Sequence, residues 1–286
     1  KNYLTIHQDT TTMYKTMLLI SLLIQNIQAL CIYSKELTSP KGIANISGEC
    51  YINASLQALF TLTHINHNIR IRSNLLPKRS FLAKYLQALN TYQITTHENY
   101  VSLKYEKLRS QQNEPTDIVQ KFILEYQQSL AKENDISLTV IDVEQYNNLA
   151  DNIKNCFNSK ARYHIIIINN PMRKTIKSIF NNKRLKDTSL IDIQNNKFLK
   201  LIASINSCYL KTKNERITTT TGANHSSSYV NYDGQWFFCN DYDIQKTNTT
   251  KISKFLQAKT NKENINYTTI FNLSPGILFY ETIQID

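Results

Sequence analysis

One cysteine of this chain lies where a protein could use it as a nucleophile. Cys50 follows a loop of small and polar residues and begins a helical pattern, with four apolar residues from Ile52 to Phe60 on one face. At a helix N-terminus, the unpaired N–H groups and the helix dipole favour a thiolate over a thiol. Asn45, five residues earlier, could direct its amide at an oxyanion on the carbonyl that Cys50 attacks. For an isolated cysteine, a buried structural role is the commoner alternative.

The residues around Cys50 also resemble a known motif. Gly42-Ile-Ala-Asn45, followed by Cys50-Tyr-Ile-Asn-Ala-Ser-Leu-Gln-Ala-Leu-Phe60, is similar to the cysteine box of the ubiquitin-specific proteases. That family has Gly-Leu-x-Asn, a short glycine-containing link, and Cys-Tyr-Met-Asn-Ser-x-Leu-Gln, with the same spacing from asparagine to cysteine. Ser47 and Glu49 depart from the glycine and threonine that are usual in the family. The resemblance implies an α+β fold, with a papain-like helical thumb packed on a mostly antiparallel palm sheet.

Later segments follow in the family's order and extend the resemblance over about residues 41–281. Residues 113–118, after Gln111-Gln112, weakly resemble the family's Gln-Gln-Asp box. Residues 228–232, the Asp233-Gly234 turn and residues 235–239 predict a β-hairpin that resembles the histidine box. Residues 274–281 predict a last strand that resembles the family's closing strand.

The resemblance implies a catalytic site of Cys50, a histidine and Asn240, with Asn45 at the oxyanion. Asn240 falls where the family has the Asp or Asn that orients the histidine. The alignment places Ser228 at the histidine itself, and serine is no base at neutral pH. The same comparison implies that Ser228, Tyr229 and Asp241 contact the substrate tail.

The nearest histidine to the aligned position is His225, three residues upstream. An unbent strand would place His225 about 10 Å from that position and on the opposite face. We therefore expect His225 to serve as the base only if residues 226–228 bulge, and we expect Ser228→His to raise the rate.

Length and composition bound the other interpretations. The chain has 286 residues, 41% of them hydrophobic, which is enough for one large domain or two small ones. We expect a leader over residues 1–40 and a catalytic domain over 41–286. The net charge of +11 would suit nucleic acid, but the lysines are scattered, so we expect no nucleic-acid partner. The five cysteines form no C-x-x-C pair, so we expect no structural zinc, no cofactor, and fingers reduced relative to the family.

Several further elements are predicted from periodicity. Residues 81–89 and 148–157 predict helices, and a third helix begins near residue 113 with Thr116 as a possible N-cap. Residues 162–168 predict a buried strand, in which His164 is a core histidine rather than a catalytic one. Residues 181–215 are interpreted as a remnant of the fingers or as a surface insertion.

The compartment stays open between two interpretations of the N-terminal region. Met13–Ala29 resembles a secretory signal, with a basic residue and an apolar run too short to span a bilayer, so no stable membrane span is expected. A docked helix in a cytoplasmic or nuclear protein is the alternative. Asn45, Asn53 and Asn224 begin Asn-x-Ser glycan acceptors at the predicted site, which argues against a glycosylating secretory route.

Three functions remain from these observations. The first is thiol-dependent hydrolysis of ubiquitin or ubiquitin-like conjugates at the C-terminal glycine of the modifier, with low turnover because of Ser228. The second is a pseudoenzyme that binds ubiquitin or a protein partner without cleavage. The third, a basic RNA-associated module, depends on the net charge alone.

Overall fold

The computed structural model describes residues 13–17, 20, 37–45, 48–94, 100–101, 114–130, 135–142, 153–169, 190–194, 196–212, 224–247 and 269–285. The chain divides into two compact units, 1–37 and 38–286. In the first unit, residues 13–17 and 20 are helical, and Met13, Tyr14, Met17 and Ile20 are more than half exposed. No helix within these ranges is long and apolar enough to cross a membrane. Most of the predicted signal segment lies outside the described residues, so its role stays a prediction.

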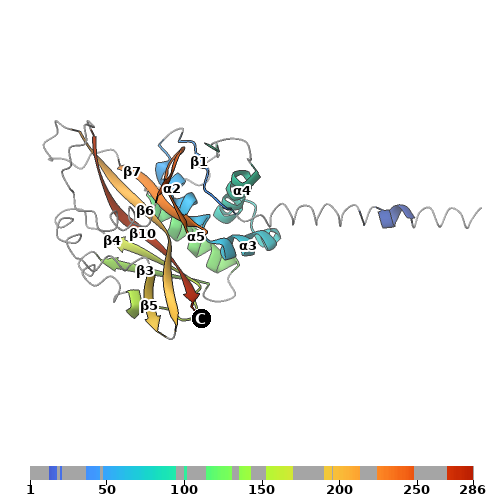
Figure 1. Cartoon of the computed structure of the whole chain (residues 1–286). Helices are drawn as coiled ribbons and strands as arrows, with labels where there is room; N and C mark the ends of the chain where they lie inside the picture. Colours follow the sequence, from blue (N-terminus) through green and yellow to red (C-terminus); the bar gives the residue numbers. More distant parts are fainter. Residues whose placement is uncertain are drawn as a thin grey trace, which may run out of the picture. The chain divides into compact units, whose positions relative to one another are not determined.

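The second unit is built on an eight-stranded sheet (Figure 1). The sheet path runs through β3 (Ile136–Asp142), β4 (Tyr163–Asn169), β10 (Thr269–Gln284), β6 (Lys197–Thr212), β7 (Asn224–Tyr232), β8 (Gln235–Asn240) and β9 (Asp243–Thr247). Strand β5 (Leu190–Gln194) pairs with β6 away from this path. The β3–β4 pair is parallel, whereas the other described pairs of this sheet are antiparallel.

Four helices gather on one side of the long strands β6, β7 and β10 (Figure 1). They are α2 (Cys50–Leu59), α3 (Thr63–Ile71), α4 (Phe81–Ile94) and α5 (Pro115–Ser129), with the short 3₁₀ helix η1 (Ser73–Leu75) after α3. All ten residues of α2 are buried, because the helix packs against β7, β6 and α5. Two short strands pair in parallel: β1 (Gly42–Ile43), which comes before α2, and β2 (Tyr100–Val101), which comes between α4 and α5.

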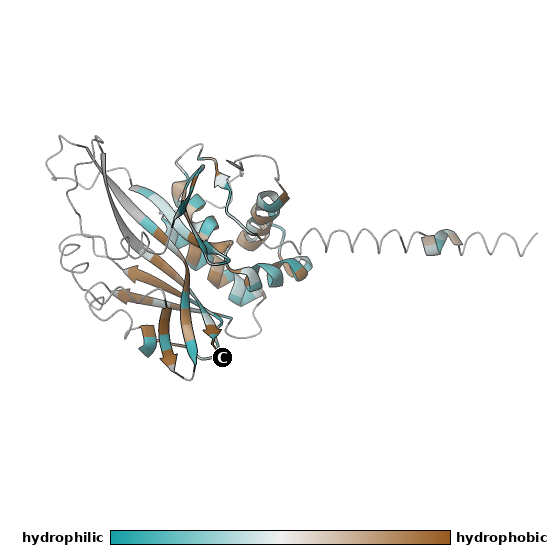
Figure 2. Cartoon of the chain, viewed as in Figure 1, coloured by the Kyte–Doolittle hydropathy of each residue, from teal (hydrophilic) through white to brown (hydrophobic). Residues whose placement is uncertain are grey.

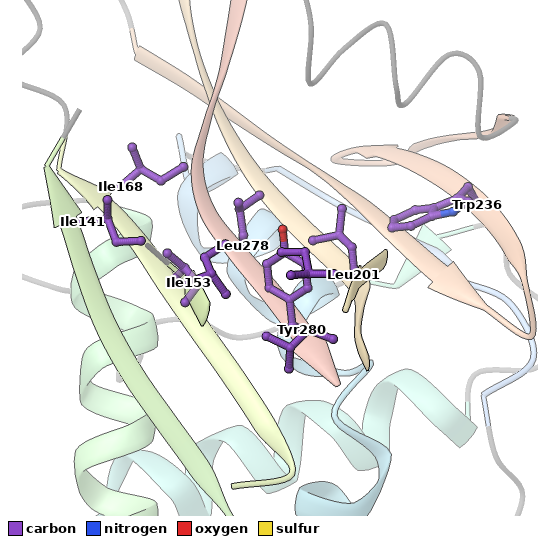
Figure 3. Packing of buried hydrophobic residues seen from close by; sticks show 10 residues of the cluster. Ile141, Ile153, Ile168, Leu201, Trp236, Leu278 and Tyr280 are labelled. Atoms are coloured by element: carbon purple, nitrogen blue, oxygen red, sulfur yellow. The ribbon is translucent and has the colours of Figure 1, made fainter. Parts of the chain in front are cut away.

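Two apolar groups hold the unit together. Aromatic rings from α4, α5 and Phe60, the C-cap of α2, pack on one another. The ring centroids of Phe60 and Tyr92 are 4.7 Å apart, and those of Tyr85 and Phe122 are also 4.7 Å apart. A second cluster lies across the sheet and includes Ile141, Ile153, Ile168, Leu201, Trp236, Leu278 and Tyr280 (Figure 3).

The strands β3 and β4 are rich in apolar residues, as Figure 2 shows. Since β4 has a neighbour on each side and is covered on both faces, its sequence is continuously apolar rather than alternating.

The mixed α and β composition with a mostly antiparallel sheet confirms the predicted α+β class. The helix predicted over 81–89 is α4, and the strands predicted over 162–168 and 274–281 are β4 and the end of β10. His164 is 2% exposed and stacks on Phe157 at 4.9 Å, as expected of a core histidine. The helix predicted over 148–157 is described only from Ile153, where residues 153–155 are helical.

Two sequence-based expectations differ from the structure, and one helix was not expected. Helix α5 has Glu114 as its N-cap and Pro115 at its first turn, so the prediction of Thr116 as N-cap was wrong; the fixed φ of proline suits the first helical position. Helix α3 was not predicted. Residues 197–212, interpreted as part of a fingers remnant or surface insertion, form β6 in the interior of the sheet. Lysines at the start of β6 obscured its buried centre, residues 201–206.

Candidate active site

Cys50 is the first residue of α2, as the sequence predicts, and its N-cap is Glu49. The side chain is nearly buried, at 7% exposed. The N-cap Glu49 carries a carboxylate next to Cys50, whereas the first turn of α2 itself carries no acidic residue. The helix dipole has its positive end at this position. This position suits a group that develops negative charge.

The β7–β8 hairpin provides the second part of the site. Its two turn residues, Asp233 and Gly234, have φ values of 50° and 82°, the left-handed conformation that a two-residue hairpin turn with this twist requires. The turn fixes the register, with Tyr232 opposite Gln235 and Ser228 opposite Cys239. The same register, continued by one residue on each strand, places Asn240 opposite Ser227.

His225 and Asn240 meet at the open end of this hairpin. Because alternate residues of a strand share a face, His225 lies on the same face as Ser227 and therefore as Asn240. His225 Nε2 is 2.5 Å from Asn240 Oδ1. An amide oxygen only accepts hydrogen bonds, so the ring carries its hydrogen on Nε2. The other ring nitrogen, Nδ1, is then left to take a proton.

Cys50 is a second partner of the His225 side chain. A hydrogen bond with Cys50 is the largest influence on the ring and raises the pKa of His225 to about 9. Burial acts in the opposite direction, while the bond to Asn240 and the charges of Cys50 and Asp241 raise the pKa further. The structure therefore brings together three predicted site residues: Cys50, His225 and Asn240.

Ser228 does not occupy the position of a base, and this corrects the alignment. Its side chain is fully buried, at 0% exposed, and lies opposite Cys239, on the face that Asn240 does not share. The pairing of β7 with β6 is continuous from Asn224, so the expected bulge over residues 226–228 is absent from this strand. The predicted contact of Ser228 with a substrate stays a prediction.

The other predicted substrate contacts have structural partners of their own. The ring of Tyr229 is partly buried and packs on Phe238 at 4.9 Å, and burial raises the pKa of Tyr229 to about 12. The carboxylate of Asp241 accepts hydrogen bonds from two asparagines, Asn45 at 2.9 Å and Asn53 at 2.7 Å. A role for Tyr229 or Asp241 in substrate binding stays a prediction.

Asn45 lies in the loop before Cys50, and its amide is bonded at both ends. Asn45 Oδ1 accepts from the backbone N–H groups of Gly48 and Glu49 at 3.0 and 2.9 Å, and Asn45 Nδ2 donates to Asp241. These bonds fix the amide plane beside the start of α2. The predicted contact with an oxyanion would use the second hydrogen on Asn45 Nδ2.

Two positions near the site were not given a role from the sequence. Asn53 is quoted in the motif, but its bond to Asp241 depends on a residue 188 positions away. Gly42 lies against Tyr242 so closely that an added Cβ would be 2.3 Å from the Tyr242 carbonyl oxygen. The two-residue turn at Asp233-Gly234 could have identified His225, since it fixes which residues share the face of Asn240.

Two other cysteines, Cys156 and Cys239, have different surroundings. Cys156 is exposed and Cys239 is buried, and burial raises the pKa of the Cys239 thiol well above its usual range. Within the described ranges, no three His, Cys, Asp or Glu side chains gather as a metal site would need.

Comparisons with known proteins give a likeness of fold. No protein-family model matches the chain, and no curated protein does. Among solved structures, a chain of the Ubp8–Sgf11–Sgf73–Sus1 SAGA DUB module matches with a TM-score of 0.52 and 12% identity, over 93% of this chain and 74% of that chain. A structure of the module bound to monoubiquitin matches with a TM-score of 0.50 and 12% identity, over 93% of this chain and 75% of that chain.

Proposed function

We propose that this chain is a papain-like cysteine hydrolase in which Cys50 is the nucleophile, His225 the base and Asn240 the residue that orients the base. The observation that supports this most is the arrangement of His225, which bonds Asn240 through Nε2 and also has a hydrogen bond with Cys50. A nucleophile, a base and an orienting group in this order are what thiol-dependent acyl transfer requires.

The proposed reaction proceeds in two halves. His225 Nδ1 takes the proton of the Cys50 thiol, which gives an imidazolium beside a thiolate, and the thiolate of this ion pair attacks the substrate carbonyl. The oxyanion is held by backbone N–H groups at the start of α2 and by the remaining hydrogen of Asn45 Nδ2. The imidazolium then gives its proton to the leaving amine, which leaves a thioester on Cys50. Water attacks the thioester with His225 again as base, which releases the carboxylic acid and restores the thiol.

The proposed substrate is the C-terminal glycine of ubiquitin or a ubiquitin-like protein joined to another protein. Two observations support this class: the resemblance of residues 42–60 to the cysteine box, and a likeness of fold to a DUB module that has been seen with monoubiquitin. In this proposal α2–α5 form the thumb, the large sheet forms the palm, and the fingers are reduced.

A pseudoenzyme that binds ubiquitin without cleaving it is the second candidate. The position of His225 beside Cys50 weighs against its first argument, which is serine in place of the base. The observation that still favours it is the burial of Cys50, since a side chain only 7% exposed must become accessible before it can attack a carbonyl.

A ubiquitin that carries a C-terminal electrophile separates the two candidates. We expect the purified protein to form a covalent adduct at Cys50, located by peptide mass spectrometry, and Cys50→Ala to form none. Cys156→Ala is the matched control, because Cys156 is an exposed cysteine with no role in the proposed site, so this variant should react at the rate of the parent. Binding of ubiquitin without an adduct would support the pseudoenzyme, and an adduct at Cys156 alone would contradict the proposed nucleophile.

A further inference from the structure

A single residue at the end of β8 joins the parts of the site that come from different segments. Asp241 has a φ of 53°, which turns the chain sharply after Asn240. Its Oδ2 accepts from Asn45 Nδ2 at 2.9 Å, its Oδ1 accepts from Asn53 Nδ2 at 2.7 Å, and its carbonyl accepts from the Ile43 N–H at 2.8 Å. Asp241 thus contacts both the loop before Cys50 and the helix that carries Cys50.

Asn53 is the partner of Asp241 on the helix. It lies three residues after Cys50 on α2, which places it about one turn along the helix from the nucleophile. The side chain is 2% exposed, and Asn53 Nδ2 also approaches the carbonyl oxygens of Ile43 and Ala44 at 3.3 and 3.4 Å. The amide of Asn53 therefore fixes α2 against both the preceding loop and Asp241.

The residue before Asp241 is Asn240, which bonds His225. A displacement of Asp241 would consequently move the group that orients the base at the same time as it releases Asn45. Gly42 permits this arrangement, because any side chain there would meet the backbone of Tyr242 and separate the loop from the β8–β9 turn.

We propose that Asn53 is a positioning residue: through Asp241 it sets the distance between the Cys50 helix, the Asn45 loop and the Asn240–His225 pair. The proposal rests on the proposed function for its effect on turnover, but the hydrogen-bonded connection itself can be tested without activity. Asn53 does not touch the reacting atoms in this proposal, so its loss should affect the chemical step rather than substrate affinity.

The first test is Asn53→Ala, measured with a fluorogenic ubiquitin C-terminal substrate. We expect kcat to fall about 100-fold with KM changed little, the size expected when reacting groups are displaced by about 1 Å. Asn66→Ala is the matched control: Asn66 is also buried on a helix and bonds Leu59, Phe60 and Tyr85, but it lies away from the site. The melting temperature of Asn66→Ala should fall by about as much as that of Asn53→Ala, while its kcat stays near that of the parent.

A paired substitution tests the contact between the two side chains. Asn53→Asp places two carboxylates at hydrogen-bond distance and should lower turnover more than Asn53→Ala does. Combining it with Asp241→Asn restores one amide and one carboxylate in exchanged positions, with an oxygen still available to Asn45 Nδ2. We expect the double variant to turn over faster than Asn53→Asp alone. A double variant no better than that single variant would contradict a direct role for the pair.

Hydrogen exchange provides the measurement that does not depend on activity. The Gly48 and Glu49 amides donate to Asn45 Oδ1, so they should exchange faster in Asn53→Ala if Asn53 holds Asn45 through Asp241. Unchanged exchange overturns the connection, and faster exchange with an unchanged kcat overturns the positioning role. If the parent neither labels nor cleaves, the proposed function fails, and the exchange rates alone then decide whether the connection exists.

Discussion

Replacement of Cys50 by alanine should lower the pKa of His225, and this change tests the geometry of the candidate site without a substrate. The largest influence on His225 is its hydrogen bond with Cys50, and the charge of Cys50 acts in the same direction. Both are removed in Cys50→Ala, whereas the bond to Asn240 is kept. We therefore expect the pKa of His225 to fall from about 9 toward its ordinary range.

The expected change is large enough to measure directly. At pH 7.5, a histidine with a pKa of about 9 is about 97% protonated, whereas one with the ordinary pKa of about 6.5 is about 9% protonated. The change in the pKa of His225 from about 6.5 to about 9 corresponds to at most about 3.4 kcal/mol of stability. Solvent screening reduces this value because the ring is only half-buried. His225 thus contributes stability that is present below pH 6.5 and is lost as the pH rises through about 9.

The assay is an NMR titration of the histidine Cε1–H signals from pH 5 to pH 10. The chain has six histidines, so the His225 signal is assigned by its loss in His225→Gln. Cys156→Ala serves as the control, because this thiol is exposed and should leave the titration of His225 unchanged. If the pKa of His225 in Cys50→Ala stays near that of the parent, the thiol does not interact with the ring and the reasoning about the site fails.

Three other predictions concern buried positions. Ser228→His should give no gain in rate and should destabilise the fold by about 1–3 kcal/mol in chemical denaturation, because Ser228 is fully buried opposite Cys239 and an imidazole overpacks this position; a faster enzyme would restore the original alignment. Gly42→Ala should also lower the free energy of unfolding by about 1–3 kcal/mol, since its Cβ would lie 2.3 Å from the Tyr242 carbonyl oxygen. A melting temperature equal to that of the parent would contradict that close approach. Burial lowers the pKa of His164 to about 4, so between about pH 6.5 and pH 4 the unfolded chain binds a proton that the folded chain does not. The parent should therefore lose stability as the pH falls through this range, and His164→Phe should lose less. Equal slopes of unfolding free energy against pH in the two proteins would refute this prediction.

Local features of the sequence predicted the parts of the fold that depend on neighbouring residues. The helix at Cys50, the continuous apolar strand and the hairpin at Asp233-Gly234 each follow from periodicity or turn chemistry within a few residues. Helix α3 was missed because only three of its nine residues are apolar, Ile65, Ile69 and Ile71, and because it has no strong cap: its N-cap Leu62 makes no side-chain hydrogen bond to the helix. Strand β6 was misinterpreted because charged residues at its start gave the segment the composition of a surface loop.

The sequence by itself determined that Cys50 begins a helix, that Asn240 ends a hairpin strand, and that an asparagine lies five residues before the cysteine. It did not determine which residue faces Cys50. Similarity to a motif placed Ser228 there, because a match of residue types carries no information about strand register or face. The register of β7 against β8, set by the turn, places His225 on the face of Asn240 and buries Ser228 against Cys239. The tertiary structure likewise decided the roles of Asn53 and Gly42, because both depend on contacts with Asp241 and Tyr242, which lie about 190 residues or more away in the chain and reach the Cys50 helix only when the sheet has formed.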